Sequence, residues 1–352
     1  MTNPTASPFS SIEYFREQFN QGLHDLLHHQ KLGTFILVLA NATQHKDLFQ
    51  QLQAKLQEQF KTLKQNYHNA LLNGNQLNEV EEDLLVFLKI ATIDFENIKL
   101  TQIRKQGHWQ YQFNHIRSFR PRRISSFHGT NEMFIPYDEH AFNFNKPFMA
   151  KECFWEGQLT GKQIDLFYNK YPFADLHGLF VPERKSCLPQ LLTQELHEYM
   201  WQVTEQLSET LPGLGFGYNS YGAYASVNHL HFQMFVETTS LPITSGHWQH
   251  NAGNETYPIN VIKHNNVNEA WQTLNALHKQ KKPYNVLYVK NEMYIIPRKI
   301  QGSVEVPEWS SGFTWAELCG GLLMFNQDDY LNVKETDVVE LLSAIETRVE
   351  NV

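Results

Sequence analysis

Residues 226–235 read SVNHLHFQMF, in which polar and bulky apolar side chains alternate. Alternation with a period of two is typical of a β-strand, where successive side chains point to opposite faces. The polar residues, which would share one face of that strand, are His229, His231 and Gln233. The apolar residues between them would pack into a core, so the polar face is available for chemistry.

The composition is that of a globular protein. The chain has 352 residues, of which 41% are hydrophobic and 13% aromatic, so it can bury a large core. Lys and Arg total 29 against 37 for Asp and Glu, a formal net charge of -8. Such a chain lacks the broad positive field of nonspecific nucleic-acid binders. We expect a small-molecule partner and no nucleic acid.

The N-terminal segment and the cysteines bear on location. The start, MTNPTASPFSS, lacks the basic and apolar regions of a signal peptide, and the longest apolar run, FILVLA, is far short of a spanning helix. The three cysteines, Cys153, Cys187 and Cys319, are widely separated and form no C-x-x-C pair. This usage fits a reducing compartment and offers no cysteine zinc framework. We expect a cytoplasmic protein without a membrane partner, a cofactor or a bound metal.

The pattern along the chain predicts an α+β fold. Helical spacing predicts helices at about 10–30 and 44–66. From about 150, two strands, an amphipathic helix that ends before Pro212 and two further strands follow, and then a weaker helix and the hairpin YNVLYVKNEMYIIPRK. This order predicts a mostly antiparallel sheet flanked by helices, with two pseudo-repeated lobes. We expect N-terminal helices and first strands in 1–110, packed on a core in 111–352.

The histidine pair alone carries little weight, since 17 histidines in 352 residues give an H-x-H sequence about once by chance. An exposed strand, hydrogen-bonded core histidines or a metal pair would also explain it. The preceding segment GYNSYGAYAS is rich in small residues. Small residues let a phosphate approach backbone N–H groups, which favours a nucleotide pocket.

The combination of NKYP at 169–172, HGLFVP at 177–182 and SVNHLHFQ at 226–233 resembles the histidine-triad and galactose-1-phosphate uridylyltransferase superfamily. Within it, GYNSYGAYASVNHLHFQ is most similar to the GDP-hexose phosphorylases. The segments RSFRPRR, FNFNKPF and WAELCGGLLM agree with that branch, so the resemblance spans about 110–350. It implies a histidine-triad-like fold.

The resemblance implies a role for each residue of the opening stretch. His231 would attack the α-phosphorus and form a covalent nucleotidyl-histidine, which a neutral imidazole can do. The backbone carbonyl of His229 would accept a hydrogen bond from the other ring nitrogen. Gln233 would donate its amide to a nonbridging phosphate oxygen. A glutamine there, where hydrolytic members have a third histidine, favours transfer over hydrolysis.

The same resemblance places Asn169 and Asn219 near the nucleotide and Ser226 near its phosphates. Asn169 could equally cap the turn that follows it, and His177 is implied to brace the sheet. A basic run adds a candidate phosphate ligand, Arg120, by charge-assisted bonds. A solvated face or an interaction patch explains such a run equally well. The run comprises Arg117, Arg120, Arg122 and Arg123.

The expected activity is cleavage of a GDP-hexose by inorganic phosphate to GDP and hexose 1-phosphate. Two enzymatic alternatives stay open, a dinucleoside polyphosphate phosphorylase and a UDP-sugar or hexose-1-phosphate uridylyltransferase. A third alternative is a non-catalytic nucleotide- or metal-binding protein with ligands among His229, His231, His247 and His250. The resemblance also allows a homodimer.

Overall fold

The computed structural model describes residues 7–121, 132–237 and 240–350. Its largest element is an eight-stranded sheet with the order β3-β4-β5-β7-β6-β9-β10-β8, in which all neighbours are antiparallel. The predicted α+β fold with a mostly antiparallel sheet is confirmed. The strands are β3 Cys153–Leu159, β4 Lys162–Tyr168, β5 Gly178–Pro182, β6 Leu214–Asn219, β7 Phe232–Val236, β8 Ile262–His264, β9 Tyr284–Val289 and β10 Glu292–Pro297.

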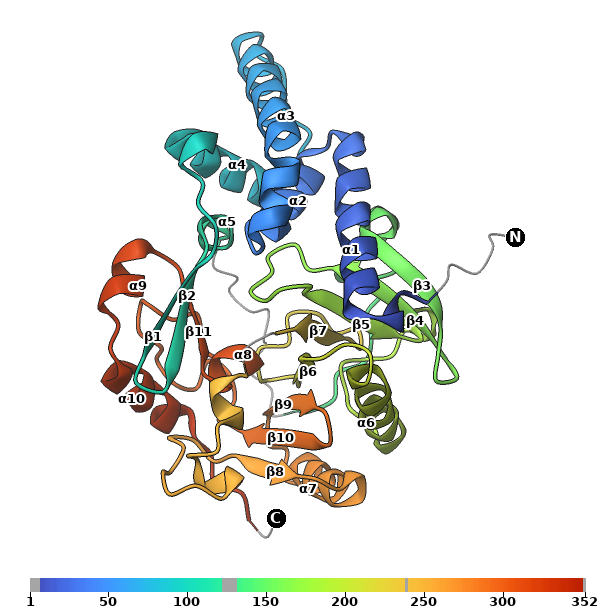
Figure 1. Cartoon of the computed structure of the whole chain (residues 1–352), viewed down its shortest axis with the longest axis vertical. Helices are drawn as coiled ribbons and strands as arrows, with labels where there is room; N and C mark the ends of the chain where they lie inside the picture. The colour runs from blue at the N-terminus through green and yellow to red at the C-terminus, as the bar shows by residue number, and fades with distance from the viewer. Residues whose placement is uncertain (1–6, 122–131, 238–239, 351–352) are drawn as a thin grey trace.

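A smaller sheet lies beside the large one and is flanked by the C-terminal helices (Figure 1). Its order is β1-β2-β11, with β1 and β2 antiparallel and β11 parallel to β2. These strands are β1 Gln102–Gln106, β2 Trp109–Phe113 and β11 Gly321–Met324. The helices are α1 Ile12–Leu26, α2 Leu32–Ala42, α3 Lys46–Leu72, α4 Glu81–Ile93, α5 His115–Phe119, α6 Gln194–Ser208, α7 Val267–Lys279, α8 Trp315–Leu318, α9 Gln327–Asn332 and α10 Glu335–Ile345.

The two expected lobes share one continuous sheet. The first half runs β4, β5, α6, β6, β7, and the second runs β8, α7, β9, β10, with β6 paired to β9 across the junction. His197 on α6 connects the halves, since its Nε2 lies 2.9 Å from the Val267 oxygen and its Nδ1 lies 2.9 Å from the Tyr288 hydroxyl. β9 and β10 form the predicted hairpin, in which Asn291 takes the left-handed conformation (φ 60).

The second half of the large sheet is buried on both faces. In β9, Val286 and Tyr288 belong to a core shared with α6 and α7, while Leu287 between them faces a second core. That second core contains Trp109 of the small sheet and Trp315 of α8. Strands covered on both sides read as nearly continuous apolar runs, as YNVLYV does. The sheet is therefore the middle layer of three.

The N-terminal helices gather at one end of the molecule, and α1 lies against the edge formed by β3 and β4 (Figure 1). α1 and α3 correspond to the two predicted helices, but α2 was not predicted. All of its residues except Gly33 are buried, so its sequence has no polar face and no helical period. Among the described residues, no helix is both long and apolar enough to cross a bilayer.

The predicted division at residue 110 stays a prediction, but the two segments share one core. Leu37 on α2 is fully buried in the same cluster as Ile164 on β4 and Phe180 on β5. A core of this kind couples the folding of the helices to that of the sheet.

Leu37→Ala is expected to lower the free energy of unfolding of the whole chain by about 2–5 kcal/mol, because the truncated side chain leaves a cavity in the shared core. Urea denaturation followed by circular dichroism and tryptophan fluorescence measures this loss. Leu72→Ala is the matched control, since Leu72 is 73% exposed at the end of α3. An early separate transition, with the main one unchanged, would show instead that the helices fold independently of the sheet.

Candidate functional site

His231 is a buried, neutral imidazole with one nitrogen fixed. Its side chain is 7% exposed, and its Nδ1 lies 2.8 Å from the backbone oxygen of His229. A carbonyl oxygen can only accept, so Nδ1 carries the proton and Nε2 keeps its lone pair. Burial lowers the pKa of His231 to about 4, although the bond to His229 opposes the shift. At neutral pH the ring therefore presents an unprotonated Nε2.

Gln190 fixes the backbone around His231. Its Oε1 accepts from the His231 N–H at 2.9 Å, and its Nε2 donates to the oxygens of His231 and Asn219, each at 3.1 Å. The Asn228 Oδ1 in turn accepts from the Gln190 N–H at 3.0 Å. The sequence gives no signal for this role, because a lone glutamine in an irregular segment has no period that would mark it as buried.

Trp315 orients the Gln233 amide. The indole Nε1–H donates to Gln233 Oε1 at 3.1 Å, and His177 also hydrogen-bonds the Gln233 side chain. An indole nitrogen can only donate, so the amide oxygen must face Trp315 and the NH₂ group must point elsewhere. The Gln233 NH₂ group therefore lies on the side of the amide that faces away from Trp315. It is left as a hydrogen-bond donor.

The same tryptophan orients the second amide of the site. The backbone N–H of Trp315 donates to Asn219 Oδ1 at 3.0 Å, and Asn285 Nδ2 donates to the same oxygen at 2.6 Å. Trp315 is 1% exposed and stacks on Phe235 with ring centroids 5.0 Å apart. A Cβ at Gly217 would lie 2.1 Å from the indole, so only glycine leaves room for Trp315. Both amides thus present their NH₂ ends.

The segment that begins at Trp315 agrees with the resemblance, but the sequence predicts no role for Trp315 itself. The residue is 82 positions from its partner Gln233 and 96 from its partner Asn219. No local pattern connects residues at such separations. A tryptophan opposite a glycine-rich strand is a signal only after the pairing of the strands is known.

The imidazole of His229 is part of the scaffold. Its Nδ1 accepts from the Phe144 N–H at 3.2 Å, and its Nε2 lies 3.0 Å from the Arg184 oxygen, to which it donates. Burial lowers its pKa to about 4. Both nitrogens are used, so only the backbone carbonyl of His229 serves His231. A metal pair of His229 and His231 would break these bonds.

The predicted strand begins too early, because β7 starts at Phe232 and both histidines precede it. The backbone turns away from a regular ladder there to make the bonds to Gln190 and Leu188. The apolar residues of the predicted alternation do pack together in the main core. These are Leu230, Phe232 and Met234.

Asn169 and His177 form a local pair beside the site. Asn169 Oδ1 accepts from the Tyr171 N–H at 3.0 Å, which is the turn-capping bond, and its Nδ2 lies 3.1 Å from His177 Nε2. His177 is fully buried, and its Nδ1 accepts from the Phe173 N–H at 3.3 Å. Burial, and after it the charge of Arg117, lowers the pKa of His177 to about 3. His177 thus lies inside the fold, where a sheet-bracing residue belongs.

Ser226 and Arg120 are not drawn into this network. Ser226 is exposed in the loop before His229. Arg120 follows α5, where its Nε lies 3.7 Å from Glu82 Oε1 and its guanidinium lies over the Tyr171 ring at 5.2 Å. Arg122 and Arg123 lie outside the described residues.

Of the two described members of the basic run, Arg117 is the one whose charge acts on His177. Its Nη1 donates to the Tyr171 oxygen at 2.6 Å, and its guanidinium lies over the Phe173 ring at 5.0 Å. Burial lowers its pKa to about 10, opposed by the charge of Glu317. Its Nε is buried without a hydrogen-bond partner among the described residues. A half-buried cation with an unused, buried donor is suited to an anionic ligand.

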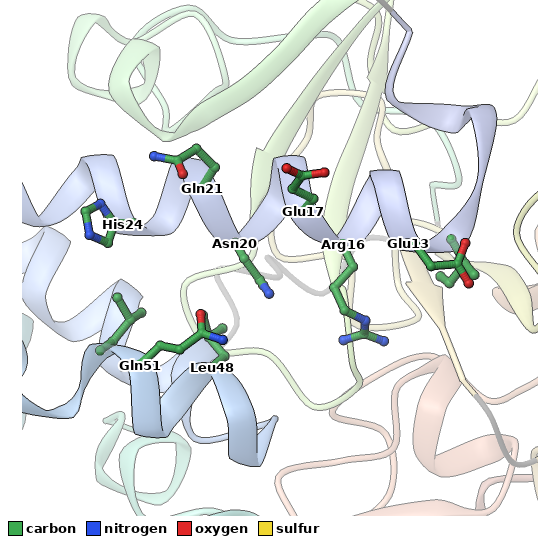
Figure 2. Close-up of a pocket in the computed structure, with 10 residues that line it drawn as sticks. Glu13, Arg16, Glu17, Asn20, Gln21, His24, Leu48 and Gln51 are labelled. Atoms are coloured by element: carbon green, nitrogen blue, oxygen red, sulfur yellow. The ribbon is translucent and has the colours of Figure 1, made fainter.

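A cavity of about 610 Å³ lies elsewhere, between α1 and α3 (Figure 2). Arg16 and Asn20 on α1 and Leu48 and Gln51 on α3 are among the residues that line it (Figure 2). None of the predicted site residues lines it. Its link to the site is the ion pair of Arg16 with Asp175 at 2.5 Å, in the loop between Asn169 and His177.

Residues 90–235 match the family model described as GDPGP1-like, N-terminal domain. GDP-D-glucose phosphorylase 1 of Danio rerio is 34% identical over 110 residues, which cover 31% of each chain. The Macaca fascicularis protein of the same name is 33% identical over 140 residues, 38% of this chain and 35% of that one. GDP-L-galactose phosphorylase 2 of Arabidopsis thaliana is 35% identical over 75 residues, 21% of this chain and 17% of that one.

The matched regions therefore cover between 17% and 35% of these relatives' own lengths. Among solved structures, the yeast Ap4A phosphorylase Apa2 in complex with AMP aligns with a TM-score of 0.48 at 15% identity, over 78% of this chain and 100% of that one. Residues 90–235, which contain His229, His231 and Gln233, thus match the model of the GDPGP1-like N-terminal domain, and the resemblance to the GDP-hexose phosphorylases is confirmed for this part of the chain.

Proposed function

We propose that this protein is a nucleotidyltransferase of the phosphorylase type, which cleaves a GDP-hexose with inorganic phosphate to GDP and hexose 1-phosphate. The observation that carries the proposal is the buried neutral His231, whose Nδ1–H is held by the His229 carbonyl while Nε2 keeps its lone pair. The names of the relatives, GDP-D-glucose and GDP-L-galactose phosphorylase, supply the substrate class. The reaction would proceed in two displacements at one phosphorus atom.

In the first displacement, His231 Nε2 attacks the α-phosphorus, and the bond from that phosphorus to the oxygen bridging the two phosphates breaks. Hexose 1-phosphate leaves with that oxygen. The guanylylated ring becomes cationic, and its Nδ1–H strengthens the bond to the His229 carbonyl. In the second displacement, a phosphate oxygen attacks the same phosphorus, the P–N bond breaks and GDP leaves. Two displacements at one phosphorus give retention of its configuration.

The donors around His231 support charge stabilisation in both displacements. The NH₂ groups of Gln233 and Asn219 would bind the nonbridging oxygens of the α-phosphate. Trp315 holds both amide oxygens, so neither amide can turn its acceptor end toward the phosphate without losing a hydrogen bond. We assign to Arg117, in place of Arg120, the neutralisation of phosphate charge, because its charge acts on His177 and its Nε is buried without a hydrogen-bond partner among the described residues.

The roles of Asn169 and Ser226 as nucleotide ligands, a homodimer and a cytoplasmic location stay predictions. Asn169 would act through His177 and the adjoining turn. Ser226 would reach the phosphates from the loop that precedes His229.

Incubation with a GDP-hexose radiolabelled in its α-phosphate, without inorganic phosphate, is expected to label the protein. The label should be lost in acid and stable in base, as expected of a phosphorus–nitrogen bond to histidine, and added phosphate should release it as GDP. His231→Asn should not be labelled, because asparagine replaces the Nδ1 donor but offers no nucleophile. Labelling of that variant, or its turnover at the wild-type rate, would falsify the proposed intermediate.

A substrate panel of GDP-glucose, GDP-L-galactose, GDP-mannose, UDP-glucose and a dinucleoside tetraphosphate tests the substrate class. Phosphate-dependent release of GDP from one GDP-hexose, well above all other compounds, is the expected result. Preference for the tetraphosphate or for UDP-glucose would move the protein to one of the alternative activities with the same histidine chemistry.

Trp315→Phe is expected to lower kcat by about tenfold or more with a smaller change in KM, because the ring is kept while the indole donor that orients Gln233 is lost. Steady-state kinetics on the preferred GDP-hexose measure both constants. Trp271→Phe is the control, since Trp271 lies on α7 and packs on His197. Equal changes in both variants, or a change in KM alone, would contradict the positioning role of Trp315.

Stability is expected to decrease as the pH falls from about 6.5 toward 4. The folded His231, with a pKa of about 4, resists a proton that the unfolded residue accepts near pH 6.5. Its contribution is complete above pH 6.5 and is lost at roughly 1.4 kcal/mol per pH unit as the pH falls through that range. His231→Asn should therefore show a shallower dependence in urea denaturation. His140→Asn, at an 88% exposed position, should match the wild type; an unchanged slope in His231→Asn would refute the shift.

A further inference from the structure

We infer that His108, His247 and Glu255 bind a divalent transition-metal ion, with Zn²⁺ as the ion that fits the donor set. His108 lies in the turn between β1 and β2, while His247 and Glu255 lie in the segment between β7 and β8. One ligand atom of each residue lies within 4.8 Å of the other two. The sequence predicts no bound metal because it has no cysteine pairs. That prediction does not concern a site built from histidine and glutamate ligands.

The spacing of the three side chains is close to that of a metal site. His108 Nε2 lies 2.9 Å from Glu255 Oε2, and the rings of His108 and His247 have centroids 4.1 Å apart. Zinc–ligand bonds of roughly 2.0–2.2 Å in a tetrahedron put the ligand atoms about 3.3 Å from one another. Small side-chain rotations therefore suffice to surround an ion.

His247 supplies a nitrogen that the protein itself leaves unused. Its Nε2 is buried without a hydrogen-bond partner among the described residues, and its Nδ1 lies 2.5 Å from the Ser245 hydroxyl. A buried polar atom without a partner destabilises the fold, and a metal bond would offset that cost. Donation by Nδ1–H to Ser245 leaves the Nε2 lone pair for the ion, which is how second-shell partners orient histidine ligands.

The backbone holds His247 and Glu255 together without help from the ion. The Glu255 N–H donates to the His247 oxygen at 3.0 Å, and the Gln249 N–H donates to the Glu255 oxygen at 2.8 Å. A Cβ at Gly253 would lie 2.0 Å from the His247 oxygen, so glycine is needed for this close approach. Trp248, between them, is 3% exposed and packs on Tyr257. Only His108 comes from another element.

The donor atoms of this cluster favour Zn²⁺, and its surroundings favour it over a second cluster of similar spacing. Two imidazoles and one carboxylate suit Zn²⁺, whereas Ca²⁺ and Mg²⁺ prefer oxygen ligands only. A second cluster, His24, Asp25 and His28, has similar spacing. There, however, Lys55 Nζ lies 2.5 Å from His24 Nε2, and its positive charge opposes a cation. The site at His108 would tie the β1–β2 turn to the segment that carries His247.

Metal analysis of the tag-free full chain tests the proposal, after removal of bound metal and reloading with Zn²⁺ against a chromophoric chelator. We expect one Zn²⁺ per chain, a higher melting temperature with Zn²⁺ than without, and visible absorption bands of a four-coordinate site with Co²⁺. His247→Ala should weaken Zn²⁺ binding at least about tenfold. His108→Gln, on a partly exposed turn, tests the site independently of the folding of the His247 segment.

The controls are His140→Ala, at an exposed position, and His28→Ala, in the second cluster. Both should keep the wild-type stoichiometry and affinity. Zn²⁺ binding that survives both His108→Gln and His247→Ala, or that is lost in His28→Ala, would overturn the assignment, as would the absence of stoichiometric binding. The readout does not depend on the proposed transfer reaction.

Discussion

The hydrogen bond from His231 Nδ1 to the His229 carbonyl determines what the site can do. It fixes the tautomer, and burial keeps the ring neutral, so the lone pair stays on Nε2 at physiological pH. The bond exists only because the His229 backbone is held, and that residue's own imidazole holds it, through the Phe144 N–H and the Arg184 oxygen. The two histidines of the H-x-H sequence thus have different roles: His229 anchors the backbone, and His231 keeps a nitrogen with a free lone pair.

A second constraint joins the site to the core of the fold. Trp315 fixes the direction of two amides, through its indole to Gln233 and through its backbone to Asn219. The indole can lie there only because β6 has a glycine at 217, and because the second core surrounds the ring. A change in the packing of Trp315 would therefore also change the orientation of the Gln233 and Asn219 amides. The donors are rigid because the tryptophan that orders them is itself a core residue.

Much of this could be predicted from sequence, and the rest fails for identifiable reasons. The hairpin β9–β10 and the helix α6 follow from local period and turn chemistry, including the left-handed Asn291. Helix α2 is missed by sequence-based prediction, because a helix that is buried on all sides has no polar face. The early start assigned to β7 treats the alternation at His229 and His231 as strand, whereas Gln190, 41 residues before His231, fixes the backbone there. Trp315, Gln190 and Arg117 are invisible for the same reason: their roles depend on partners distant in the sequence.

The buried histidines of the chain differ in how their two ring nitrogens are used. Buried imidazoles with both nitrogens bonded act as neutral connectors, as His197 does between α6, α7 and β9 and as His229 does between two loops. Burial lowers the pKa of both, so neither carries charge at neutral pH. A connector has no nitrogen left for chemistry. His231 and His247 differ from these connectors in their surroundings: His231 has Nδ1 held and lies near two oriented amides, and His247 has Nδ1 held and its Nε2 beside an imidazole and a carboxylate. These neighbours are the reason why we propose phosphorus chemistry for the first and metal chemistry for the second.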